Sequence, residues 1–184
     1  GTGIGAGIIT KGALYRGATN SAGEWGHTKI VLHGRRCRCG GQGCLEAYVG
    51  APGILASQRE AGGQPQDDQF EAVGQLVDAY RRGVPAAERV MQDLTQVLGV
   101  GIANLVNLFN PERIEIGGWA GLLIGGALLD DPTACGKKKA LPLSTKELSI
   151  SLCQLGEDAI CTGAACLVLE EFLSANLKFN RGIY

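Results

Sequence analysis

Four residues with metal-binding side chains lie close together in the sequence, in the order His27, Cys37, Cys39 and Cys44. Three thiolates and one imidazole make up the ligand set of a closed, tetrahedral zinc site. The segment 40–43 contains three glycines, which let the backbone turn tightly enough for the sulfur atoms to converge on one ion. Because no ligand position is left for water, the pattern predicts a structural zinc ion rather than a catalytic one.

The alternative interpretation of this segment is a surface loop that carries free thiols. Three exposed thiols so close together would be prone to oxidation, which favours the zinc interpretation. Positive charge beside a cysteine stabilises its thiolate form, the form that binds zinc. Three arginines flank the cysteines and are expected to supply this charge, namely Arg35, Arg36 and Arg38.

Two motifs contain the cluster, namely Gly-Glu-Trp-Gly-His at residues 23–27 and Cys-Arg-Cys-Gly-Gly-Gln-Gly-Cys-Leu-Glu at residues 37–46. These motifs resemble the ROK family, named for repressors, open reading frames and kinases. Further segments look like the same family in the same order, namely 1–7, 107–111, 117–118, 155–158 and 163–165. The resemblance therefore covers nearly the whole chain. It implies an α/β protein with an actin-like ATPase (ribonuclease H-like) fold, in which two lobes enclose a cleft.

The resemblance also implies a sugar site beside the cluster, with Glu24, His27 and Glu46 as the binding residues. One ring nitrogen of His27 would hold zinc while the other faces the sugar, which is chemically sound because the two nitrogens are distinct. A carboxylate can accept hydrogen bonds from two sugar hydroxyls. Without the surrounding motif, the same two glutamates would be interpreted as solvated surface acids.

Two glycine-containing segments resemble the family's nucleotide-binding loops, whose backbone amides can surround phosphate groups. The implied nucleotide-binding residues are Thr2, Gly3, Gly5, Gly117 and Gly118. A glycine run alone would be equally typical of an ordinary hairpin turn. The second loop departs from the family because Trp119 stands where a third glycine is usual.

Composition limits the class of protein. The 17 basic and 18 acidic side chains leave a net charge of -1, so no global basic field points to nucleic acid or to an anionic membrane. No apolar run approaches the ~20 residues that a membrane span needs. We expect no secretory leader, and therefore a soluble, cytoplasmic protein. The seven cysteines do not suit a closed disulfide framework. Outside the cluster, Cys153, Cys161 and Cys166 lie in apolar stretches and are expected to be buried.

The hydrophobic periodicity predicts alternating helices and strands, as in a layered α/β domain. Helices are predicted at 45–58 (broken at Pro52 and Gly53), 67–82, 85–109, 119–129 and 158–173. Strands are predicted in a hairpin over 4–15 that turns at Lys11 and Gly12, and at 28–33, 113–116 and 148–152. The segment 130–146 is predicted to be a loop, since Pro132 and Gly136 disfavour a continuous helix.

The chain is expected to be one part of a larger protein. Kinases of the family use an aspartate as general base and a first phosphate loop, both in the front lobe. Residues 1–184 contain neither an Asn-Asp pair nor that loop ahead of the first glycine run. We therefore expect residues 1–184 to be the C-terminal back lobe of a ROK domain, with the front lobe and any DNA-binding domain outside this chain.

Two functions are compatible with this resemblance. The favoured one is the sugar-sensing domain of a bacterial transcriptional regulator of carbohydrate metabolism, because Trp25 and Trp119 look like the regulator branch. DNA would then be bound only through an upstream domain. The alternative is the back lobe of an ATP-dependent sugar kinase, with ATP and Mg²⁺ as cofactors. Either protein would bind a hexose or a related sugar, and we expect it to self-associate, most simply as a dimer.

Overall fold

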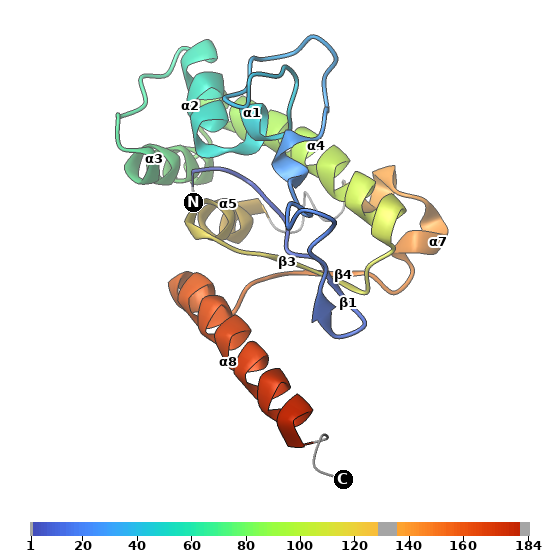
Figure 1. Cartoon of the computed structure of the whole chain (residues 1–184). Coiled ribbons are helices and arrows are strands. Elements are labelled where there is room, and N and C mark those ends of the chain that lie inside the picture. Colours follow the sequence, from blue (N-terminus) through green and yellow to red (C-terminus); the bar gives the residue numbers. More distant parts are fainter. Residues whose placement is uncertain (1, 129–135, 181–184) are drawn as a thin grey trace.

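The computed structural model describes residues 2–128 and 136–180, and its centre is the long helix α4 (Pro85–Phe109). Pro85 begins this helix, where its missing N–H costs no hydrogen bond, and Asn110 ends it in a left-handed conformation. Three further helices pack against α4 and form one layer with it, namely α1 (Glu46–Val49), α2 (Ala51–Glu60) and α3 (Gln69–Arg81) (Figure 1). The predicted helices at 67–82 and 85–109 are confirmed.

The hydrophobic core lies between these helices and α5 (Trp119–Leu128). Its fully buried side chains include Leu45, Ile54, Val73 and Met91. A second, smaller cluster surrounds the C-terminal half of α4 and contains Ile102, Val106 and Leu148. Trp25 packs against both clusters, so the segment that carries Glu24 and His27 is attached to the core of the protein.

The strands form two small sheets. β3 (Arg113–Ile116) and β4 (Ser149–Leu152) are parallel, with Ile114 opposite Ile150, and α5 lies against both. β1 (Ile9–Thr10) and β2 (Ala13–Leu14) form an antiparallel hairpin. Lys11 and Gly12 both have positive φ angles, as a two-residue hairpin turn requires, so the predicted turn is confirmed although the strands are shorter than expected.

The predicted strand at 28–33 is wrong. Only Lys29 forms an isolated bridge, with Cys44, and the N–H groups of Ile30 and Val31 both point to the carbonyl oxygen of Gly43. His33 has a φ of 56°, a left-handed conformation that no regular strand contains. This segment hydrogen-bonds to the cysteine loop instead of to a sheet.

Two predicted boundaries are also corrected. The helix over 45–58 breaks at Gly50, which is extended, while Pro52 lies in the first turn of α2, where proline is tolerated. The predicted loop at 130–146 is partly helical, because residues 136–139 are helical and α7 spans Pro142–Thr145. Pro132 lies outside the described residues.

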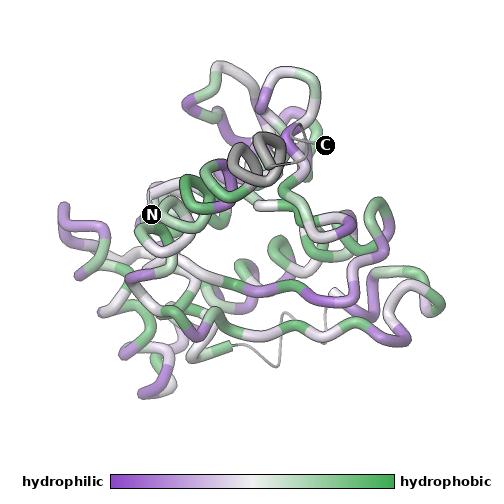
Figure 2. Tube along the Cα trace, turned by 60° about the horizontal axis from the view of Figure 1, so that its bottom comes forward, coloured by the Kyte–Doolittle hydropathy of each residue, from purple (hydrophilic) through white to green (hydrophobic). Residues whose placement is uncertain are grey.

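The last helix, α8 (Ala159–Asn180), is longer than predicted and follows the short 3-10 helix η2 (Gly156–Asp158). It lies apart from the helical layer (Figure 1), and hydrophobic residues line it (Figure 2). Val168 and Leu169 are 71 % and 56 % exposed. Cys161 and Cys166 are exposed on the same helix, so the prediction that they are buried is wrong, and Cys153 is half-buried.

Helices long and apolar enough to cross a membrane do not occur in the part of the chain that the structure describes.

Candidate metal centre and ligand site

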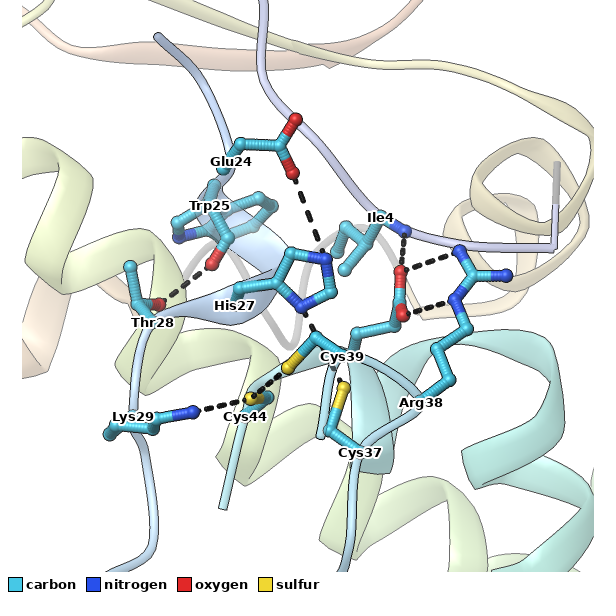
Figure 3. Close-up of polar contacts among 11 residues, drawn as sticks. Ile4, Glu24, Trp25, His27, Thr28, Lys29, Cys37, Arg38, Cys39 and Cys44 are labelled. Carbon is cyan, nitrogen blue, oxygen red and sulfur yellow. Dashed lines mark hydrogen bonds and ion pairs between the residues drawn. The ribbon is translucent and has the colours of Figure 1, made fainter. Parts of the chain in front are cut away.

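The four predicted metal ligands converge. The ligand atoms of His27, Cys37, Cys39 and Cys44 all lie within 4.8 Å of one another. Cys37 Sγ is 3.7 Å from His27 Nδ1, and Cys39 Sγ is 3.7 Å from Cys44 Sγ (Figure 3). Cys37 and Cys44 are buried, His27 is half-buried and Cys39 is exposed, so the cluster lies just beneath the surface.

The spacing of these atoms fits a tetrahedral ion. With Zn–S bonds of about 2.3 Å, two sulfur ligands in tetrahedral geometry are about 3.8 Å apart, and a sulfur and a nitrogen ligand about 3.6 Å. The Cys37–His27 and Cys39–Cys44 separations, both 3.7 Å, agree with these values. His27, Cys37, Cys39 and Cys44 could therefore hold one metal ion with only small movements of their side chains.

Lys29 supplies positive charge to the thiols, a role that the sequence did not indicate. Lys29 Nζ donates a hydrogen bond to Cys44 Sγ at 2.8 Å, and this bond raises the pKa of Lys29. Two of the three expected arginines, Arg35 and Arg38, pair with glutamates instead. The isolated β-bridge between Lys29 and Cys44 places the lysine side chain beside the cluster. Neither the residue type of Lys29 nor its distance from the cysteines in the sequence indicates this contact.

The thiols differ in their acidity. A hydrogen bond from the Gly41 backbone, together with hydrogen bonds from Cys37 and Cys44, lowers the pKa of Cys39 to about 7. Burial raises the pKa of Cys37. The exposed Cys39 is thus more readily deprotonated than Cys37, which suits a first contact with an arriving cation.

Trp25 fixes the segment that carries Glu24 and His27. This tryptophan begins the short 3-10 helix η1 (Trp25–His27), and its indole N–H donates to the Gly101 carbonyl oxygen on α4 at 3.2 Å. A Cβ at Gly101 would press on the Trp25 ring and on Leu45. The close approach of the ring to α4 therefore requires glycine at that position, and the ring in turn positions His27.

Arg35 attaches the cysteine loop to the helices, a role that the sequence analysis also missed. Its guanidinium donates to the Gly53 carbonyl oxygen and to Ser57 on α2, and pairs with Glu60. The same guanidinium lies 4.9 Å from the centre of the Tyr48 ring. Its position beside three cysteines predicts that Arg35 stabilises thiolates by its charge. In the structure, its planar guanidinium instead links the loop to α2 by hydrogen bonds and lies against the Tyr48 ring.

The three predicted sugar-binding residues lie around the cluster in different environments. Glu24 is exposed, and its carboxylate is 3.7 Å from His27 Nε2, on the side of the ring opposite to the cysteines (Figure 3). Glu46 is only 6 % exposed at the start of α1. Its carboxylate pairs with Arg38 and accepts a hydrogen bond from the Ile4 backbone N–H.

The predicted nucleotide-binding residues are only partly brought together. Gly3, Gly5 and Gly117 line a cavity of about 680 Å³ between residues 3–11, α4, β3 and α5. The side chains that α4 contributes to its wall are apolar, whereas Lys11, Arg113 and Glu115 add charged side chains beside the glycine backbone. Thr2 and Gly118 do not line this cavity, and neither do the three sugar-site candidates. Thr2 instead accepts a hydrogen bond from the Ala51 N–H through its carbonyl oxygen.

The sequence pattern of the ROK family matches residues 1–171 of this chain. The chain belongs to the ROK family. Its relatives include both repressors and kinases. It is 31% identical to the xylose repressor of Caldicellulosiruptor bescii, with 95% of this chain and 45% of the repressor covered. It is 33% identical to the glucokinase of Streptomyces coelicolor, with 92% of this chain and 57% of the glucokinase covered.

A solved ROK-family structure has the same fold. The glucokinase from Streptomyces griseus, in complex with glucose and AMPPNP, matches with a TM-score of 0.70 at 28% identity, over 91% of this chain and 57% of that chain. This match confirms the predicted α/β, actin-like ATPase fold of the ROK chain. The chain spans about half the length of the curated relatives that it matches.

Proposed function

We propose that this ROK chain is the sugar-sensing part of a bacterial transcriptional regulator of carbohydrate metabolism, and that its metal ion is a structural zinc. The residues 1–184 would form the C-terminal lobe of the ROK domain. The front lobe, and the domain that binds DNA, would belong to other parts of the same protein. The ligand would be a hexose or a related sugar.

The orientation of the His27 ring carries this proposal. Nδ1 faces Cys37 and Nε2 faces Glu24, so a single imidazole borders the metal cluster on one side and the exposed carboxylate on the other. An ion held by the cysteines would fix the ring and its tautomer, and Nε2 could then donate a hydrogen bond to a sugar oxygen. The proposed zinc thus supplies rigidity to the ligand site, while the protein supplies the hydrogen bonds.

Sugar binding is tested with Glu24→Gln in the zinc-loaded chain. A hydrogen bond from a hydroxyl to a carboxylate contributes about 1.5–3 kcal/mol, so we expect hexose affinity to fall roughly 10- to 100-fold. Calorimetric titration with a panel of pentoses and hexoses measures the change. Glu147→Gln, an exposed glutamate outside the site, is the matched control. Equal affinities of the Glu24 variant and the unchanged chain would contradict the proposed role of Glu24.

A sugar kinase is the second candidate, and the cavity lined by Gly3, Gly5 and Gly117 favours it. One observation favours the regulator instead. Trp119 occupies the place of the family's third glycine and packs its ring against Phe70, with 5.6 Å between ring centres. A bulky residue engaged with α3 leaves less room for close approach of a nucleotide than glycine does.

A kinase assay tests whether residues 1–184 are a self-contained enzyme. With ATP and Mg²⁺ supplied, we expect residues 1–184 to show no sugar phosphorylation, since the expected general base lies in the front lobe. Robust turnover that disappears in Glu24→Ala would contradict the regulator proposal.

Self-association is expected through α8. The exposed apolar side chains Val168 and Leu169 stand on a helix that lies apart from the rest of the described chain (Figure 1). Apolar surface of this kind tends to find a partner, and a two-fold dimer is the commonest arrangement. We expect light scattering at micromolar concentration to give about twice the 19.2 kDa of one chain.

The α8 variant Val168→Glu should lower that mass, while Glu171→Gln on the same helix should not. A mass near 19.2 kDa for the unchanged chain, constant on tenfold dilution, would contradict the expected dimer.

A further inference from the structure

Lys29 lies opposite Cys44 across a short antiparallel pairing of the backbone. The Leu45 N–H donates to the Thr28 carbonyl oxygen at 2.9 Å, which fixes one flank of this pair. Side chains that are opposite each other in an antiparallel pair lie on the same face of it. The pairing therefore directs the lysine toward the cluster, where Nζ lies 2.8 Å from Cys44 Sγ (Figure 3).

Gly41 leaves room for the ammonium group of Lys29. A Cβ at Gly41 would lie 2.6 Å from Lys29 Nζ and 3.5 Å from Cys39 Sγ. The backbone at Gly41 is not left-handed, so the turn itself does not require glycine at this position. The ammonium group thus occupies the space beside the sulfur atoms that a side chain at residue 41 would fill.

The proposed zinc site needs a positive charge of this kind. Three thiolates and a neutral imidazole around a divalent ion leave one negative charge in excess. The ammonium group of Lys29 carries one positive charge and three N–H donors, one of which points to the Cys44 sulfur. Arg35 and Arg38, which flank the cysteines in the sequence, pair with glutamates, so their charges are already offset.

We propose that Lys29 retains the zinc ion, because its ammonium group donates to the metal-bound sulfur of Cys44 and offsets the excess negative charge of the site. The inference rests on the proposed structural zinc and names a residue on which the retention of that ion depends. Lys29 is a positioning residue, since it acts on the metal through Cys44. Loss of the ion would also release the ring of His27 from its fixed orientation.

The rate of zinc release from the loaded chain tests this role, and it is followed by colour with an excess of a chromogenic chelator. Lys29→Met removes the charge and the donors but keeps the apolar stem, and we expect it to release zinc roughly tenfold faster or more. Lys29→Arg, which keeps a charged donor, should release zinc more slowly than Lys29→Met. Lys146→Met, at an exposed lysine outside the cluster, should release it at the unchanged rate.

Gly41→Ala displaces the ammonium group without removing the lysine. We expect faster zinc release from this variant than from the unchanged chain, because the added methyl group takes the place of Lys29 Nζ. Combined with Lys29→Met, the same alanine should cause no further acceleration, since both changes remove one and the same interaction. Gly74→Ala in α3, where a Cβ meets nothing within 4 Å, is the control for a glycine replacement.

A spectrum of the cobalt-loaded chain reports the contact with sulfur directly. Cobalt(II) binds the same kind of site as zinc and gives a charge-transfer band from its sulfur ligands. A donated N–H lowers the energy of the sulfur lone pairs, so the band should move to longer wavelength in Lys29→Met. It should stay in place in Lys146→Met. A loss of packing that leaves the sulfur atoms unchanged would not move this band.

Equal release rates for Lys29→Met and the unchanged chain, or a cobalt band that does not move, would overturn the role of Lys29 but leave the zinc site intact. Additive effects of Gly41→Ala and Lys29→Met would also overturn it. Absence of stoichiometric metal from the unchanged chain would overturn both this role and the structural zinc. If Lys29→Met does not fold, Lys29→Gln replaces it, and zinc release faster than from the unchanged chain is again expected.

Discussion

Replacing Cys44 with serine is expected to remove the metal ion and to lower the free energy of unfolding by more than about 4 kcal/mol, since structural zinc contributes directly to folding. Cys44 is fully buried and lies at the centre of the cluster, where it contacts both Cys39 and Lys29. Serine offers a poor zinc ligand at this position and removes the sulfur atom to which Lys29 donates its hydrogen bond. Urea unfolding and metal analysis on the same sample measure the two effects.

Cys161→Ser is the matched control, because Cys161 is exposed on α8, outside the cluster. This variant should keep its metal ion and change the stability by less than about 0.5 kcal/mol. If Cys44→Ser retained a full complement of metal, or if both variants unfolded at the same urea concentration, the four residues would not form a structural metal site.

Gly43→Ala is expected to be far more harmful than Gly40→Ala, although both glycines lie in the same loop with positive φ angles of 70° and 87°. Alanine in this left-handed conformation costs about 1–2 kcal/mol at either position. At Gly43 the new Cβ would also collide with the Val31 backbone carbonyl, whereas at Gly40 nothing lies within 4 Å. Backbone cannot move aside as a side chain can, so we expect Gly43→Ala to cost at least about 2 kcal/mol more.

The collision at Gly43 would also separate the cysteine loop from the segment 28–33. The Gly43 carbonyl oxygen accepts hydrogen bonds from Ile30 and Val31, and the Gly43 N–H donates to the Arg35 carbonyl oxygen. We therefore expect weaker metal binding in Gly43→Ala, measured by competition with a chelator, and near-normal binding in Gly40→Ala. Equal stability of the two variants would show that the loop is packed differently.

The sequence predicted the elements whose signals are local. In α3 the Asp68 side chain accepts a hydrogen bond from the Glu71 N–H and so caps the helix, and α4 begins at Pro85 and ends at Asn110. Local stop and start signals of this kind are visible without any tertiary contact. The segment 28–33 contains the β-branched residues that are typical of a strand. Its hydrogen bonds nevertheless go to Gly43 in the cysteine loop, a pairing that the sequence does not reveal.

The candidate site was predictable where a motif specifies it. The four metal ligands follow from residue type and spacing, and they converge in the structure. The sequence could not show what Lys29, Arg35 and Arg38 contact, because an arginine or lysine side chain reaches several possible partners. The environment of Glu46 was missed for the same reason, since its pairing with Arg38 depends on how closely the glycine segment approaches α1.

Metal analysis of the freshly purified chain, prepared without chelators, tests most directly whether a zinc ion organises this site. One zinc ion per chain is expected, bound by His27, Cys37, Cys39 and Cys44. X-ray absorption at the zinc edge should then show three sulfur ligands at about 2.3 Å and one nitrogen ligand at about 2.0 Å. A chain that is folded, binds sugar and contains no stoichiometric metal would contradict the account.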